Sequence, residues 1–200
     1  MDRSQLFRDM FPDVKTSQLL TAQDVERISL PGKMTELIRG QLVVREPPGT
    51  WHGVIAANLT YYLSDFVRRH GLGIVFAQDT GFKIASHPDT VRAPDVAFLG
   101  RDRADRIPVR GYAEVAPDLL AEILSAEDRP AEVLAKVADW LAAGTKLVWL
   151  LDPEGREARV YRPDGSLSVL LEDDALGGED VLPGFRCPLK EVFFIRSTQP

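Results

Sequence analysis

A charged residue interrupts one of the most apolar short runs of this chain. Residues 118–125 have the sequence Asp-Leu-Leu-Ala-Glu-Ile-Leu-Ser, in which Glu122 stands among apolar neighbours. A continuous apolar run of this length predicts a strand that is covered on both faces. Because a buried glutamate is costly unless it is paired or binds a metal ion, Glu122 needs a partner. The identity of that partner constrains both the fold and the function.

Asp95 is the first candidate to lie near Glu122. It directly precedes a second short apolar run, residues 96–99. Side chains alternate along a strand, so positions 118, 120, 122 and 124 share one face. If the two runs form neighbouring strands, both carboxylates can converge on a divalent cation such as Mg²⁺, which prefers oxygen ligands. The alternative is structural, with the two acids in salt bridges or capping backbone N–H groups.

The order of these residues resembles a known nuclease constellation. Pro94-Asp95 is followed 27 residues later (122 − 95) by Glu122, and then by Lys136 on a predicted helix. This order resembles the PD-(D/E)XK restriction-endonuclease-like superfamily, and within it the bacterial Uma-two family, over roughly residues 17–195. The segments that carry the resemblance are Thr35–Leu42, His52 at a helix start, Ala93–Val96, Ala121–Ser125, Lys136, Trp149–Pro153, and Leu182–Phe185 before Leu189.

The resemblance implies a fold, an activity and a set of site residues. The fold is α/β, with a restriction-endonuclease-like mixed β-sheet flanked by helices (the PD-(D/E)XK core). The activity is endonucleolytic hydrolysis of DNA with Mg²⁺ or Mn²⁺, and a homodimer would present two copies of the site to two strands. The implied catalytic residues are Asp95, Glu122, Lys136 and Glu36. The metal would be held by Asp95, Glu122 and the backbone carbonyl of Ile123.

One position departs from the superfamily pattern. The usual lysine stands two residues after the acid, where this chain has Leu124. Uma-two-like sequences place a lysine on the following helix instead, and Lys136 matches that place. Helical periodicity puts Lys136 at the edge of an apolar face, beside Trp140, from where it could reach Glu122. The alternative is an i,i+4 ion pair between Lys136 and Glu132 on a solvated helix face.

Three further polar residues have open roles. Glu36 could be an additional ligand, directly or through water, or an exposed strand glutamate. His52, at the first turn of a long predicted helix, could contact phosphate, support an acid, or lie on the surface. For Ser125 we expect local hydrogen bonding rather than nucleophilic chemistry.

Periodicity and turn residues predict the order of elements. A single domain is expected over residues 17–200, after a mobile arm at 1–16, with a right-handed parallel crossover over 119–151. Residues 100–117 are predicted to be an excursion with little core character, and 172–180 an acidic loop. Helices are predicted over 21–28, 51–70 and 129–143, and strands over 34–38, 42–45, 74–76, 82–84, 96–99, 119–124, 147–151, 160–161 and 167–171.

The charge balance argues against a nucleic-acid partner. The chain has 24 Lys and Arg against 30 Asp and Glu, a net charge of −6, whereas DNA binding depends on cations that neutralise phosphates. A local basic strip can still act within an acidic protein. Two rivals to a nuclease therefore stay open, a catalytically silent nucleic-acid-binding module and a protein-interaction module. Five arginines flank Asp95 and form such a strip unless they pair with Asp102 and Asp105, namely Arg92, Arg101, Arg103, Arg106 and Arg110.

Other features predict a cytoplasmic protein without membrane association. No run approaches the roughly 18 apolar residues of a membrane span, and the charged first residues do not resemble a secretory signal. Cys187 is the single cysteine, which excludes an intramolecular disulfide and a cysteine-based zinc cluster.

Overall fold

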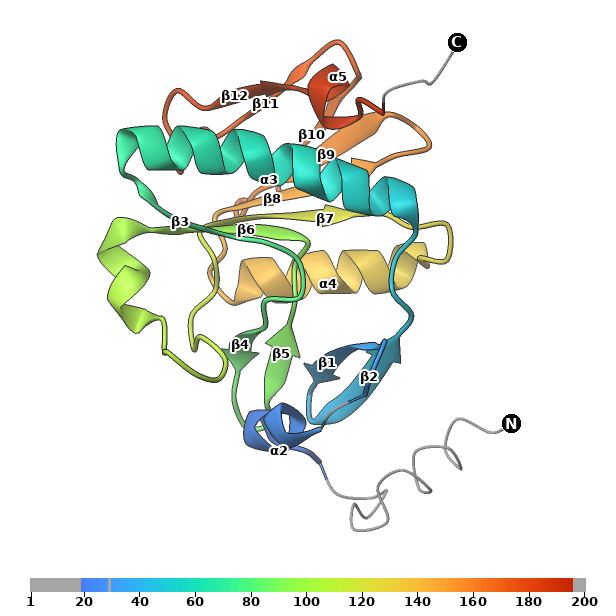
Figure 1. The fold of residues 1–200 in the computed structure, drawn as a ribbon, viewed down its shortest axis with the longest axis vertical. Helices are drawn as coiled ribbons and strands as arrows, with labels where there is room; N and C mark the ends of the chain where they lie inside the picture. The colour runs from blue at the N-terminus through green and yellow to red at the C-terminus, as the bar shows by residue number, and fades with distance from the viewer. Residues whose placement is uncertain (1–18, 29, 196–200) are drawn as a thin grey trace.

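A computed structural model of the chain, which describes residues 19–28 and 30–195, contains a six-stranded mixed sheet between two helices (Figure 1). The arm predicted over residues 1–16 lies outside the described residues. In chain order the elements are α2 (Ala22–Arg27), β1 (Met34–Ile38), β2 (Gln41–Arg45), α3 (Thr50–His70), β3 (Gly73–Phe76), β4 (Phe82–Ala85), β5 (Thr90–Arg92), β6 (Val96–Gly100), the 3₁₀ helix η1 (Arg101–Arg106), β7 (Leu119–Ile123), α4 (Pro130–Ala142), β8 (Leu147–Asp152), β9 (Glu157–Tyr161), β10 (Leu167–Leu170), β11 (Ala175–Gly177), β12 (Arg186–Pro188) and α5 (Leu189–Val192).

The large sheet has the strand order β10-β9-β8-β7-β6-β3. Strand β7 runs parallel to β8, with Leu119 opposite Leu147, and α4 makes the connection between them. Strand β6 runs antiparallel to β7, with Val96 opposite Ala121. The condition that the runs at 96–99 and 119–124 form neighbouring strands is therefore met, and the predicted parallel pairing of β7 and β8 is confirmed.

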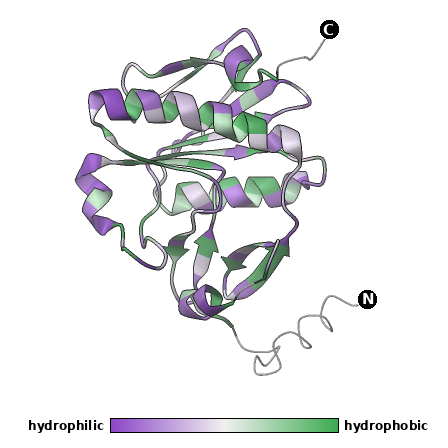
Figure 2. Ribbon diagram, in the orientation of Figure 1, coloured by the Kyte–Doolittle hydropathy of each residue, from purple (hydrophilic) through white to green (hydrophobic). Residues whose placement is uncertain are grey.

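The two helices cover opposite faces of this sheet, and alternation along β7 assigns its side chains to them. Leu119, Ala121 and Ile123 pack in the core that α3 covers. Leu120 packs in the core that contains Trp140 of α4. Figure 2 shows apolar residues concentrated along the central strands, with polar residues frequent on the outer parts of the helices. Glu122 therefore lies on the α4 side, at the end of the strand.

The local signals that predict the first elements are present in the structure. The Thr21 side chain caps α2 in a reciprocal capping box with Asp24, and α3 ends at Gly71 in the left-handed conformation, with φ of 59°. Arg39 and Gly40 have φ values of 49° and 77°, so both central residues of the β1–β2 turn have the positive φ of a type I′ hairpin. Each of these three element ends therefore has the residue type that its local conformation favours.

A second, smaller sheet with the order β2-β1-β5-β4 lies below α4 in Figure 1. The chain enters it twice, once through the β1–β2 hairpin and again through β4 and β5. The turn at Asp79–Gly81 joins strands of different sheets, because β3 pairs with β6 and β4 pairs with β5. The end of β5 leads directly to Asp95 and β6, so the small sheet meets the large one at the candidate site.

Two loop predictions are wrong in part. Within 100–117, η1 forms, and Ala113, Val115 and Ala116 are buried. Within 172–180, β11 forms and pairs with β12, which buries Leu176. These segments contain only one to three apolar residues at a time, too few to produce a detectable period. Their burial is decided by long-range packing.

Among the described residues, no helix combines the length and the apolar character that crossing a membrane requires.

Candidate active site

Glu122 is buried at the end of β7 and has two side-chain donors from α4. Lys136 Nζ lies 2.7 Å from Glu122 Oε2, and Trp140 Nε1 donates to Glu122 Oε1 at 2.8 Å. The two donors are four residues apart, so they share one face of α4. Lys136 reaches Glu122 as the helical periodicity predicts. The i,i+4 alternative is wrong, because Glu132 pairs with Arg129 and Arg45 instead.

Asp95 meets the same strand end from β6. Its Oδ2 accepts the backbone N–H of Ile123 at 2.7 Å and lies 3.2 Å from His52 Nε2. Gln78 Nε2 lies 3.0 Å from His52 Nδ1 and 3.4 Å from Asp95 Oδ1. With the Gln78 amide donating to Nδ1, the imidazole Nε2–H is directed at Asp95. His52 is buried rather than on the surface, and it supports an acid.

Glu36 joins the cluster from the small sheet and is buried, which rules out an exposed strand glutamate. Its Oε1 accepts the backbone N–H of Ala93 at 3.2 Å and lies 3.4 Å from Lys136 Nζ. Arg92 Nη1 donates to Glu36 Oε2 at 3.2 Å, and its Nη2 donates to Asp139 of α4. Lys136 therefore lies between two carboxylates, Glu36 and Glu122.

The charged groups in this cluster shift one another's pKa values. Burial raises the pKa of Glu122 to about 7, and the negative charges of Asp95 and Glu36 add to this effect against the attraction of Lys136. Burial alone would lower the pKa of Lys136, but the carboxylates of Glu122, Glu36 and Asp95 raise it above its usual value. Burial would likewise raise the pKa of Glu36, yet Lys136 and Arg92 hold it below its usual value. Lys136 is thus a firmly charged cation among acids that repel one another.

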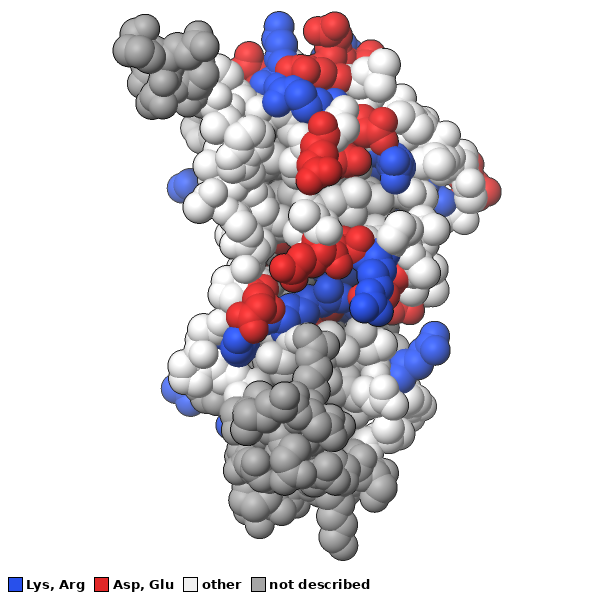
Figure 3. Space-filling model, turned by 90° about the vertical axis from the view of Figure 1, so that its right-hand side faces the viewer, with Lys and Arg blue, Asp and Glu red and all other residues white. Residues whose placement is uncertain are grey.

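Two of the five arginines near Asp95 in the sequence, Arg92 and Arg103, do not contribute to a basic strip on the surface. Arg92 is 3% exposed and turns inward to Glu36 and Asp139. Arg103 pairs with Asp118 at the other end of β7 rather than with Asp102 or Asp105. At the rim of the site, Arg45 lies 3.7 Å from Asp128. Figure 3 shows acidic and basic side chains interleaved across the middle of the face seen from the right-hand side of Figure 1.

Comparison with known proteins gives one family and one fold. The chain matches, over residues 22–190, the Uma2 family, which is described as "Putative restriction endonuclease". The chain belongs to the Uma2 family. Its structure is similar to the crystal structure at 1.96 Å resolution of a "putative nuclease" of DUF820 from Anabaena variabilis, with a TM-score of 0.74 and 21% identity, covering 87% of this chain and 97% of that one. No curated protein matches the chain.

These findings confirm the predicted resemblance and the predicted fold class. The Uma2 match spans every residue of the cluster described above, from Glu36 to Trp140. The structural neighbour supports the mixed α/β architecture at an identity too low to assign residues. Membership of the Uma2 family supports a nuclease-like role for this chain.

The donor set at this site is chemically suited to a hard divalent cation. Two carboxylates and a backbone carbonyl are the oxygen ligands that Mg²⁺ and Mn²⁺ take, and each carboxylate retains lone pairs beyond its hydrogen bonds. Burial is the main cause of the elevated pKa of Glu122, and repulsion from Asp95 adds to it; a cation between the two carboxylates would relieve that repulsion. In the described residues no three His, Cys, Asp or Glu side chains are grouped as a metal site, so a bound ion would need backbone or water ligands as well.

The sequence does not indicate the contacts that three residues of this cluster make in the structure. Trp140 was placed beside Lys136, but its hydrogen bond to Glu122 has no signal in sequence. The sequence leaves Arg92 open between a basic strip and ion pairs on a loop, and its position two residues before Pro94 on a short strand is the one signal of burial. Gln78 lies in a turn-rich segment where nothing marks it. Ser125 behaves as expected, donating from its backbone N–H and hydroxyl to Asp128.

Proposed function

We propose that this chain is a divalent-metal-dependent nuclease that hydrolyses DNA phosphodiester bonds at a centre formed by Asp95, Glu122 and Lys136. One observation carries the proposal: Lys136 Nζ lies 2.7 Å from Glu122 Oε2. The cation that the superfamily pattern expects at position 124 is thereby supplied from α4. Membership of the Uma2 family supports the same activity class. A homodimer, with one copy of the site in each subunit, is part of this proposal.

Asp95, Glu122 and the Ile123 carbonyl are the residues that would hold Mg²⁺ or Mn²⁺. A bound ion would lower the pKa of a coordinated water and offset charge that develops on the attacked phosphate. His52 fixes the orientation of Asp95 through the 3.2 Å contact, while Gln78 fixes His52 in turn. Supporting contacts of this kind hold ligands in place and commonly affect metal affinity.

Lys136 acts on the substrate side of the proposed chemistry. Its ammonium is held by Glu122 and by Glu36, whose Oε1 lies 3.4 Å away. From this position it would orient the attacking water or neutralise the phosphate, as preorganised cations do in phosphoryl transfer. Glu36 is itself fixed by Arg92 and the Ala93 N–H. In the proposal Glu36 therefore positions Lys136 and also contacts the metal ion through a water molecule.

Cleavage of supercoiled plasmid DNA with Mg²⁺ or Mn²⁺ tests this proposal. We expect Asp95→Asn and Lys136→Ala to lower the cleavage rate by about 10²- to 10³-fold, the usual cost of removing one charge-stabilising group. Glu127→Gln is the matched control, because Glu127 is exposed in the loop after β7. Equal rates for all four proteins would contradict the assignment.

A catalytically silent DNA-binding module on the same fold is the second candidate. The observation that favours it is that both Glu122 oxygens accept hydrogen bonds from protein donors, Lys136 and Trp140. A site satisfied in this way can be stable without any metal. Salt-dependent DNA binding, without cleavage and without metal affinity, would support this candidate over the nuclease.

A further inference from the structure

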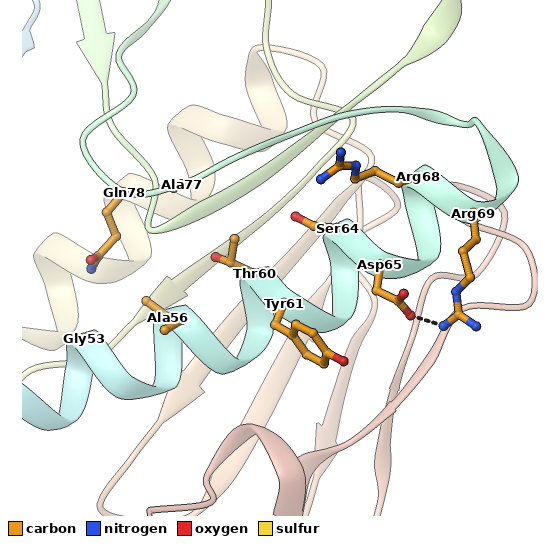
Figure 4. A pocket seen from close by; sticks show the side chains of 11 residues that line it. Gly53, Ala56, Thr60, Tyr61, Ser64, Asp65, Arg68, Arg69, Ala77 and Gln78 are labelled. Atoms are coloured by element: carbon orange, nitrogen blue, oxygen red, sulfur yellow. Dashed lines mark hydrogen bonds and ion pairs between the residues drawn. The ribbon is translucent and has the colours of Figure 1, made fainter.

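A groove runs along the outer surface of α3 and ends next to the candidate active site. Its volume is about 790 Å³, and it is bounded by one face of α3 on one side and by Ala77 and Gln78 on the other (Figure 4). The lining begins at Gly53, one residue after His52, and extends to Arg68 and Arg69 in the last turn of the helix. The groove therefore spans most of the length of α3.

Gln78 connects this groove to the active-site cluster. Its amide lines the groove and also contacts His52 Nδ1 at 3.0 Å and Asp95 Oδ1 at 3.4 Å. Figure 4 shows the Gln78 side chain directed towards the beginning of α3, near Gly53 and Ala56. A molecule lying in the groove would thus have one end beside the carboxylate of Asp95.

Near Gln78 the groove is lined by small side chains, which leave room for a bulky ligand. The far end of the groove is cationic. Arg69 pairs with Asp65 within the helix, so their charges largely cancel. Arg68 is exposed and has no ion pair among the residues that the structure describes, and Figure 4 shows it extending back towards Ser64. The net charge that the groove offers a ligand is therefore positive and is carried by Arg68.

The remaining lining residues suit a nucleic-acid strand. The hydroxyl groups of Thr60 and Ser64 face the groove and can donate hydrogen bonds to phosphate oxygens. The Tyr61 side chain is 66% exposed, which leaves its ring available for stacking. Stacking on an exposed aromatic ring requires an unpaired base, because bases within a duplex are already stacked on their neighbours.

We infer that this groove binds single-stranded DNA and leads it to the Asp95–Glu122 centre, with Arg68 on the phosphates and Tyr61 against a base. The inference rests on the proposed nuclease function for the identity of the nucleic acid. The 16 residues from Gly53 to Arg68 are separated by 15 steps of 1.5 Å and so span about 22 Å, enough for several nucleotides. A cationic groove with an aromatic platform is the usual arrangement in proteins that hold single strands.

Fluorescence anisotropy with a short labelled DNA strand of mixed sequence tests the groove. Binding is measured in EDTA, so that neither metal nor hydrolysis contributes, and the same strand in duplex form is the comparison ligand. We expect tighter binding of the single strand. Tyr61→Ala should weaken it about 5- to 150-fold, the loss of one stacked base. Arg68→Ala should reduce the slope of log K against log salt by about 0.7, one phosphate contact.

Arg110→Ala is the matched control, because Arg110 is exposed and does not line the groove. If Tyr61→Ala and Arg68→Ala bind no more weakly than Arg110→Ala, or if duplex binds as tightly as single strand, the inference is overturned. The results that would overturn the groove inference can be distinguished from those that would overturn the proposed function. A protein that cleaves plasmid DNA but is insensitive to both groove variants overturns only the groove. A protein that does not cleave, but whose binding depends on both residues, supports the groove alone.

Discussion

At the scale of single residues, the site is organised around the two α4 donors to Glu122. Alternation along β7 and periodicity along α4 were sufficient to predict that Lys136 could reach Glu122, because both patterns are local. The indole hydrogen bond from Trp140 could not be predicted, because an apolar helix position gives no indication of where its one polar atom points. The structure therefore shows a second hydrogen-bond donor, Trp140, to Glu122, the acid that the sequence indicates needs a partner.

The Trp140 hydrogen bond can be isolated with a matched pair of substitutions. Trp140→Phe removes the N–H donor to Glu122 Oε1, whereas Trp149→Phe removes an indole N–H that has no hydrogen-bond partner among the described residues. Both side chains are fully buried. We expect Trp140→Phe to lower the free energy of unfolding by about 1.5–3 kcal/mol more than Trp149→Phe does, because a hydrogen bond to a charged group contributes about that much. Equal losses in urea unfolding would show that this hydrogen bond contributes nothing.

The elevated pKa of Glu122 predicts an unusual dependence of stability on pH. The folded value of about 7 exceeds the ordinary value of 4.5, so between these two pH values the folded state holds more protons than the unfolded state. The stabilisation from protonated Glu122 is complete below pH 4.5 and is lost as pH rises through 7.

We therefore expect the free energy of unfolding of the wild type, measured in EDTA, to fall by up to about 3 kcal/mol over that window relative to Glu122→Gln. Urea unfolding at several pH values measures both proteins. The comparison removes contributions from the other acids, such as Asp118, whose pKa is lowered by the Gly100 N–H, Lys146 and Arg103 in spite of burial. A constant difference, or one that grows with pH, would contradict the burial and repulsion described for Glu122.

At the scale of elements, α4 contributes the lysine that the end of β7 does not. Long periodic elements such as α3, α4 and β7 were predicted with nearly correct bounds, because their own sequences determine them. The short strands β11 and β12 were not, because three residues carry no period and pairing between distant segments decides their structure. For the same reason, the sequence around Ala113 predicts an excursion with little core character, whereas the structure buries these residues.

Placing the lysine on the strand instead of on α4 tests whether the reaction requires the cation to come from the helix. Leu124 shares the face of Glu122 by alternation along the strand, so Leu124→Lys in a Lys136→Ala background places a cation at the usual superfamily position. We expect the double variant to recover at least about tenfold of the cleavage rate that Lys136→Ala loses, because positioned charge is what the reaction needs. A double variant as inactive as Lys136→Ala, although folded by circular dichroism, would mean that only the α4 position is productive.

At the scale of the whole molecule, the site lies where the two sheets meet. Glu36 comes from the small sheet, Asp95 and Glu122 from the large one, and Lys136 from the helix between them. Sequence reasoning named all four residues and expected Asp95, Glu122 and Lys136 to converge, but it could not predict that Glu36 would reach them from a separate small sheet, since the docking of that sheet depends on long-range contacts. The net charge of −6 was a poor guide to local electrostatics, because the basic groups of the site are buried or paired with acids.

Calorimetric titration of Mg²⁺ and Mn²⁺ into the wild type and Glu122→Gln tests the central claim most directly. If Asp95 and Glu122 hold the metal, the wild type binds at a saturable site and Glu122→Gln binds at least about 100-fold more weakly, while Glu127→Gln retains wild-type affinity. If neither the wild type nor Glu122→Gln binds metal, or if both bind equally, the claim is contradicted. Glu122 would then be a buried structural acid whose partners are Lys136 and Trp140 alone.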